Sequence, residues 1–165
     1  MKIKYVVLLT ALVSCVVLPL AAQPVKYLSP QLLDKFLATY APLQEALQNL
    51  DEEVLAEVDL SQVGDEFEPY EVDGIRTYIK SAGSHPAVLA VLKQYGWDAG
   101  FWDVLITVAF SMMYADLEEV LKVYGSEEMI ELVDTIGGQL AAQDRALVAE
   151  RRSQLETVME GVLDD

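Results

Sequence analysis

Carboxylates are the most abundant side chains capable of chemistry in this chain, which has 27 acidic and 11 basic residues. Ten of the carboxylates lie in residues 51–73, and no lysine or arginine separates them. A glycoside-type hydrolase needs two carboxyl groups at a fixed separation in a cleft. Nothing in the stretch singles out such a pair, so we interpret residues 51–73 as a solvated acidic loop with no catalytic residue.

Divalent cations offer a weaker alternative for the same loop. Ca²⁺ prefers several oxygen ligands from one loop, and residues 65–73 supply carboxylates without the order or glycine placement of an EF-hand. Zinc sites usually need several histidine or cysteine ligands, and the chain has only His85 and Cys15. His85 precedes Pro86 in a break and is interpreted as a helix-start residue. The sequence therefore predicts no resident metal and no cofactor.

Nucleophilic catalysis also lacks a motif. Ser84 stands beside His85, but adjacency in sequence does not make a dyad, and no Gly-x-Ser-x-Gly elbow occurs. A phosphate-cradling glycine loop is absent as well, because the Gly137–Gly138 pair follows a helical pattern and lacks a lysine. We therefore predict that the chain is not an enzyme.

Aromatic residues form the other distinctive group, and they cluster between positions 95 and 124. Core packing explains most of them. The alternative is a groove for an apolar ligand or a partner helix, because aromatic side chains and methionine line such sites. Two indoles and a phenyl ring cannot all face inward in one simple stripe, so one indole is expected at a surface. The residues predicted to make this contact are Trp97, Phe101, Trp102 and Met113.

A repeated phrase positions these aromatic residues. Val-Leu-Lys-x-Tyr-Gly occurs at residues 91–96 and again, 29 positions later, at residues 120–125. Glycine just past the last helical turn can adopt the left-handed conformation that ends a helix, and lysine there suits the helix dipole. We predict two helix–glycine–helix corners that share one long, central and enclosed helix. Duplication and the recurrence of a good helix ending both explain the repeat.

Helical periodicity continues through the rest of the chain, without sustained alternation of period two. Ser29 and Pro30 predict a helix start, and the later Pro42 predicts a kink or a split into two shorter helices. The run at residues 75–79 is too short to distinguish a helical turn from a strand. The sequence predicts an all-α fold, a small helical bundle of about five to six helices that forms a single domain over residues 23–165.

Further helix boundaries are marked by polar residues and glycines. Ser84, Asp98 and Ser126 each precede an apolar-periodic segment and are predicted N-caps. The Gly137–Gly138 pair predicts either a kink or the close approach of another helix. Beyond it, a thinner apolar stripe predicts a long amphipathic helix on the outside of the bundle.

The first 22 residues carry the pattern of a signal peptide. Two lysines precede the uncharged residues 5–22, which end in small side chains at Ala22. The alternative is a bacterial lipoprotein signal, residues 1–14, with lipidation of Cys15; an uncleaved span is a third. In each case the bulk of the chain lies outside the cytoplasm. We predict a periplasmic protein or a membrane-anchored lipoprotein that meets the membrane only through this segment.

Charge narrows the range of partners. Without the two lysines of the signal, 9 basic residues face 27 acidic ones, for a net charge of −18. Such a surface repels nucleic acid and anionic lipid. No motif assigns the chain to a family, so we predict an exported, non-catalytic binding or assembly module for an envelope protein. The alternatives are an apolar-ligand or lipid carrier and, more weakly, a divalent-cation-binding protein.

Overall fold

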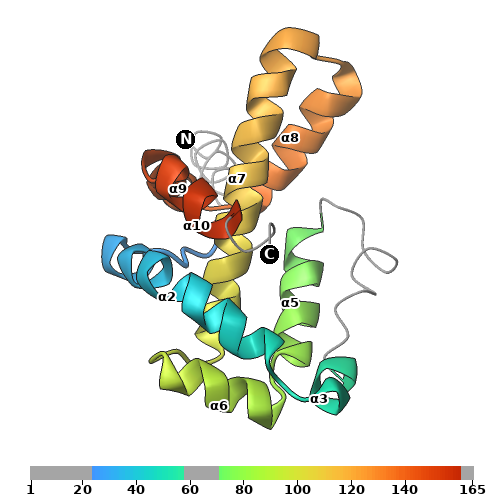
Figure 1. Cartoon of the computed structure of the whole chain (residues 1–165). Helices are drawn as coiled ribbons and strands as arrows, with labels where there is room; N and C mark the ends of the chain where they lie inside the picture. Colours follow the sequence, from blue (N-terminus) through green and yellow to red (C-terminus); the bar gives the residue numbers. More distant parts are fainter. Residues whose placement is uncertain (1–23, 58–70, 161–165) are drawn as a thin grey trace, which may run out of the picture.

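The computed structural model describes residues 24–57 and 71–160, which form eight helices and no strand (Figure 1). The helices are α2 (Pro30–Gln48), α3 (Glu52–Glu57), α5 (Val72–Ala82), α6 (Pro86–Gln94), α7 (Gly100–Tyr124), α8 (Glu127–Gln139), α9 (Ala142–Glu150) and α10 (Arg152–Glu160). The all-α prediction is confirmed. The signal segment with Cys15 and residues 58–70 of the acidic stretch lie outside the described residues.

The described helices outnumber the predicted five to six for two local reasons. Helix α3 forms at the start of the acidic stretch, where Glu52 and Glu53 in its first turn suit the helix dipole. The predicted long C-terminal helix is divided, because Leu140 takes an extended backbone (φ −111°, ψ 130°) and turns its side chain into the core. Arg151 then separates α9 from α10. The undecided run at residues 75–79 lies within α5.

Helix α2 begins as its sequence predicts. The Ser29 hydroxyl accepts a hydrogen bond from the backbone N–H of Leu32 at 3.2 Å, and Pro30 occupies the first turn. Of the two alternatives predicted at Pro42, a kink or two shorter helices, the second is wrong, since α2 runs unbroken to Gln48. Pro42 lies on the exposed side of the helix, where the carbonyl that loses its partner can be solvated by water.

The start of helix α6 differs from the prediction by one residue. His85, not Ser84, is the N-cap, and its Nδ1 accepts a hydrogen bond from the Ala87 N–H at 3.3 Å. At the start of α7 the prediction is also off by one residue, because the N-cap is Ala99, although the Asp98 carboxylate still accepts a hydrogen bond from the Gly100 N–H at 2.8 Å. His85 is thus a helix-start residue, as its place in the sequence indicates.

Helix α7 is the central element. It packs against α5, α8 and α9, and it holds more buried residues than any other helix in the described part of the chain (Figure 1). Its amino-terminal half belongs to a main apolar cluster shared with α2, α6, α9 and α10. Its other half joins α8 and α5 around a second, smaller cluster. The prediction of a long, enclosed central helix is therefore confirmed for the first half of α7.

Arginine side chains connect segments that are far apart in sequence. Each of the four arginines contacts an aromatic ring or a carboxylate on another helix or segment. Besides Arg76, described below, these contacts join Arg145 to Tyr114, Arg151 to Asp34, and Arg152 to Asp116 and Glu119. Residues 24–57 and 71–160 contain no helix with the length and apolar character that a bilayer crossing requires.

Candidate functional site

Three of the four predicted contact residues meet in the core. Trp97, Phe101 and Trp102 are 4%, 1% and 5% exposed, and the Phe101 ring lies edge-on to both indoles, at centroid distances of 5.4 and 5.1 Å. The Trp97 indole N–H donates to the Thr39 hydroxyl at 2.8 Å, and that of Trp102 donates to the Gly83 carbonyl at 3.3 Å. Both indoles are therefore packed and hydrogen-bonded.

The prediction that one indole lies at a surface is wrong. The reason is that Trp97 precedes α7, which begins at Gly100, so the helical stripe does not restrict its direction. Met113 lies apart from the three aromatic residues. It is partly buried against the second cluster, roughly 18 Å along the helix axis from Phe101 at 1.5 Å per residue. The structure does not bring the four residues into one contact surface.

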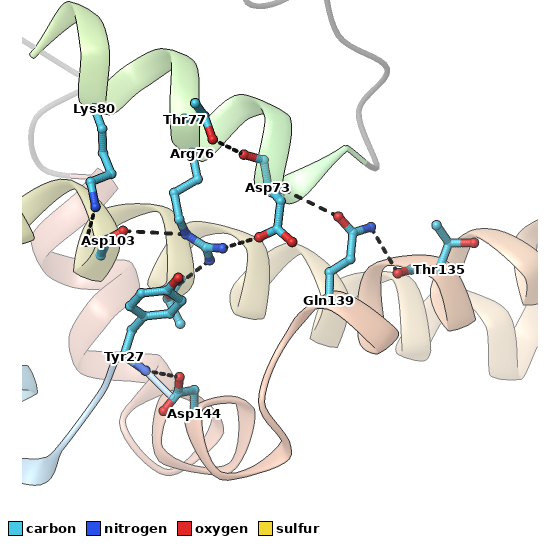
Figure 2. A network of polar contacts seen from close by, with 10 residues as sticks. Tyr27, Asp73, Arg76, Thr77, Lys80, Asp103, Thr135, Gln139 and Asp144 are labelled. Carbon is cyan, nitrogen blue, oxygen red and sulfur yellow. Dashed lines mark hydrogen bonds and ion pairs between the residues drawn. The ribbon is translucent and has the colours of Figure 1, made fainter. Parts of the chain in front are cut away.

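Arg76 forms the most connected polar cluster among the described residues (Figure 2). Its buried guanidinium contacts Asp73 at 2.5 Å, the Thr107 hydroxyl at 3.3 Å and Asp103 at 3.8 Å. The Tyr27 ring lies against it, 4.3 Å from centroid to guanidinium carbon. Helices α5 and α7 are thereby tied to the segment that precedes α2.

A second anchor holds the same amino-terminal segment. Asp144 of α9 is fully buried, and one carboxylate oxygen accepts a hydrogen bond from the backbone N–H of Tyr27 at 2.8 Å (Figure 2). The other oxygen accepts from the backbone N–H of Leu28 at 3.1 Å. Two such donors stabilise a buried carboxylate through charge-assisted hydrogen bonds. Sequence reasoning missed this residue, because its partners lie more than a hundred positions away and no local pattern marks it.

A cavity of about 450 Å³ opens beside this cluster and is lined by Tyr27, Arg76, Lys80 and Asp103, among others. Lys80 contacts the Asp103 carboxylate at 2.7 Å. The cations and carboxylates on this wall therefore balance one another. The Arg76 Nε and one Asp103 oxygen have no hydrogen-bond partner, but both atoms are covered and face each other. We interpret the cluster as a structural clamp.

Tyr114 marks the base of the hairpin formed by α7 and α8. A Cβ added at Gly137 would come within 2.7 Å of the Tyr114 ring, so the glycine permits the close approach of another helix, one of the two alternatives predicted for the glycine pair. Burial raises the pKa of Tyr114, and its hydrogen bond to Glu118 acts in the same direction, while Arg145 opposes the shift. The two helices are thus in tight contact at this level.

The opposite end of the hairpin is apolar and exposed. We call residues 118–131 the hairpin tip. Six large hydrophobic residues are exposed in the described part of the chain, and four of them belong to the tip. They are Val120, Val123, Tyr124 and Ile130, with exposed fractions of 42%, 68%, 76% and 47%. Figure 1 shows this end of α7 and α8 projecting from the rest of the bundle.

Metal binding finds no support in the described residues, which contain no group of three or more histidine, cysteine, aspartate or glutamate side chains able to hold an ion. Residues 58–70, which carry much of the predicted acidic loop, lie outside the described part of the chain. No protein-family model matches the chain, and no curated protein or solved structure matches it significantly.

Proposed function

We propose that the protein is an exported, non-catalytic binding module that engages a partner protein of the cell envelope through the hairpin tip. The observation that carries this proposal is the clustering of exposed apolar side chains at one projecting end of the fold. Single exposed hydrophobic residues are ordinary on protein surfaces, whereas a group of them marks interaction sites.

The geometry of α7 gives the tip a definable contact face. Val120, Val123 and Tyr124 stand at positions i, i+3 and i+4, so they lie on one face of the helix. Apolar anchors at this spacing are how a helix engages a partner's groove. The tip replaces the aromatic residues of the first corner as the proposed contact, because those residues are packed in the core.

The amino-terminal signal pattern supports the exported location. Exported chains meet their partners in the envelope, and a net charge near −18 for residues 23–165 does not suit nucleic acid or an anionic membrane surface. The carrier alternative receives no such support. The cavity beside Arg76 presents charged side chains, which suit water better than an acyl chain.

Site-specific photo-crosslinking in the native host tests the proposal. A photoreactive amino acid at Val123 should give a discrete adduct with another envelope protein, and the additional substitution Val120→Ser should reduce it. Leu55 of α3 provides a matched control, because it is also an exposed apolar residue, 41% accessible, outside the tip. Equal adducts from positions 123 and 55, or none from either, would contradict the proposed function.

A further inference from the structure

The hairpin tip combines its apolar residues with an excess of negative charge. Residues 118–131 contain five glutamates and one lysine, for a net charge of −4. Two of the glutamates have partners within the fold, since Glu118 accepts a hydrogen bond from Tyr114 and Glu119 pairs with Arg152. The other three, Glu127, Glu128 and Glu131, are exposed and form no ion pair with the described residues.

Helix stability explains only part of this charge. Glu127 and Glu128 stand in the first turn of α8, where carboxylates interact favourably with the helix dipole. Glu131 lies beyond that turn, and the dipole effect fades within the first turn. Its charge therefore has no such role in the helix that carries it.

A hollow on the α8 side of the tip brings two of these carboxylates together. It has a volume of about 310 Å³ and is lined by Glu128, Glu131, Leu132 and Thr135. Two carboxylates beside an apolar wall suit a lysine or arginine side chain, which packs its aliphatic stem while its charged end forms ion pairs. The hollow thus adds a polar recognition element on α8, where the exposed Ile130 stands between the two glutamates in sequence.

Charge also excludes two other occupants of the tip. A second copy of the chain, docked tip to tip, would place one net charge of −4 against another, and like charges brought together oppose association. An anionic lipid surface would meet the same repulsion. A protein surface with an apolar centre and a basic rim satisfies both features of the tip.

Building on the proposed function, we infer that the partner is a basic protein surface that packs an apolar strip on Val120, Val123 and Tyr124 and inserts a lysine or arginine between Glu128 and Glu131. The apolar residues supply contact area, and the carboxylates select the partner. Electrostatic complementarity of this kind governs specificity and association rate.

The crosslinking design extends to this inference by removing charge from the full-length protein. With the photoreactive residue at position 123, Glu128→Gln with Glu131→Gln should lower the adduct yield roughly fivefold, because two exposed ion pairs are lost. The matched control is Glu52→Gln with Glu53→Gln, which removes two exposed charges from α3 and should leave the yield unchanged. Mass spectrometry of the adduct should place the attachment in a lysine- or arginine-rich stretch.

The possible failures separate the two proposals. An adduct that persists in both glutamine variants, or that maps to an acidic stretch of the partner, would overturn the basic-surface inference and leave the tip as an interaction site. An adduct with a second copy of the chain, or with lipid, would overturn the inference and the proposed envelope partner together. The absence of any adduct would contradict both.

Discussion

The two copies of Val-Leu-Lys-x-Tyr-Gly have nearly the same sequence and opposite surroundings. At residues 91–96 the phrase ends α6 and leads into the core, whereas at residues 120–125 it ends α7 at an exposed tip. Both copies terminate a helix and carry a lysine in its last turn, as the pattern predicts. What differs is the way the chain leaves each helix.

The first corner is a complete left-handed helix ending. Gly96 has φ +75°, its N–H donates to the Lys93 carbonyl at 3.0 Å, and the Trp97 N–H donates to the Leu92 carbonyl at 2.9 Å. This pair of bonds defines a Schellman motif. Lys35 from α2 completes it, since its ammonium donates to the Gly96 carbonyl at 2.6 Å and lies 4.1 Å from the centre of the Trp97 ring.

The second corner uses its glycine differently. Gly125 has φ −52°, so the predicted left-handed conformation is wrong at this position. A Cβ there would come within 2.7 Å of the Leu121 carbonyl oxygen, which means that close approach and not handedness favours glycine. The next residue is Ser126, the confirmed N-cap of α8, whose hydroxyl accepts from the Met129 N–H at 3.2 Å.

The residue after each glycine accounts for the contrast. Trp97 brings a large apolar side chain that buries itself against α2 and α7, and so draws its corner into the core. Ser126 starts the next helix at once and brings no apolar side chain, so its corner stays outside. A shared helix-ending phrase therefore fixes where a helix stops, and the following residue decides whether the corner is buried.

The largest expected difference between the corners concerns the equivalent leucines. Leu92 is completely buried, so Leu92→Ala should lower the free energy of unfolding by about 2–5 kcal/mol through lost packing and a new cavity. Leu121 is only partly buried, and Leu121→Ala should cost about 1 kcal/mol or less. Urea unfolding followed by circular dichroism measures both. Equal losses would show that the corners are energetically alike.

Alanine and asparagine substitutions should rank differently in stability at the two glycines. Gly96→Ala should destabilise the protein by about 1–2 kcal/mol, because its left-handed backbone disfavours a Cβ, and Gly96→Asn should cost less. At Gly125 the backbone is not left-handed, so asparagine should hold no advantage over alanine. Melting temperatures of the four variants test this ranking, and an asparagine advantage at both positions would refute the distinction.

Replacing a lysine at each corner should also change stability by different amounts, and this difference should be smaller. Lys35→Met should cost about 0.5–1 kcal/mol, since it removes the cation from the Trp97 face and the hydrogen bond to the Gly96 carbonyl. Lys122→Met at the exposed corner should leave stability within about 0.5 kcal/mol of wild type. Thermal unfolding at low and high salt compares them, and an equal response to both changes would count against a specific role for Lys35.

The smallest effect is expected at Tyr114, between the core and the tip. Its pKa is raised above the ordinary value of 10.0, so the neutral phenol is favoured in the folded state. Its contribution to stability is therefore fully present below about pH 10 and is lost as the pH rises through the folded-state pKa. The difference in melting temperature between wild type and Tyr114→Phe should shrink between pH 9 and pH 11. A difference that does not change with pH would refute this assignment.

Local signals predicted the helices well. Ser29 with Pro30 and the lysine–tyrosine–glycine endings act through neighbouring backbone atoms, so short stretches of sequence contain the whole interaction. The buried Trp97 indole donates its hydrogen bond to Thr39, which lies 58 positions away in the sequence. Asp144 lies more than a hundred positions from the backbone groups that it binds. Such pairings arise from tertiary packing. They leave no pattern of local spacing, so they cannot be predicted from a single sequence.

The proposed contact surface was missed for a related reason. Periodicity alone continues the apolar side of α7 as far as Val120, although only the first half of the helix is well buried. Whether a face is covered depends on how far the neighbouring helices extend alongside it. Here α5 and α9 pack against α7, but the far end of the hairpin projects beyond the rest of the bundle (Figure 1).

The arginine contacts affect how the stability of the domain depends on salt concentration. All four guanidinium groups are engaged in ties between distant segments, so few mobile cations remain to neutralise 27 carboxylates. Counterions from dissolved salt screen the repulsion between exposed carboxylates, while the enclosed Arg76–Asp103 pair is screened less. We therefore expect the free energy of unfolding to increase with salt concentration and to be lowest at very low ionic strength.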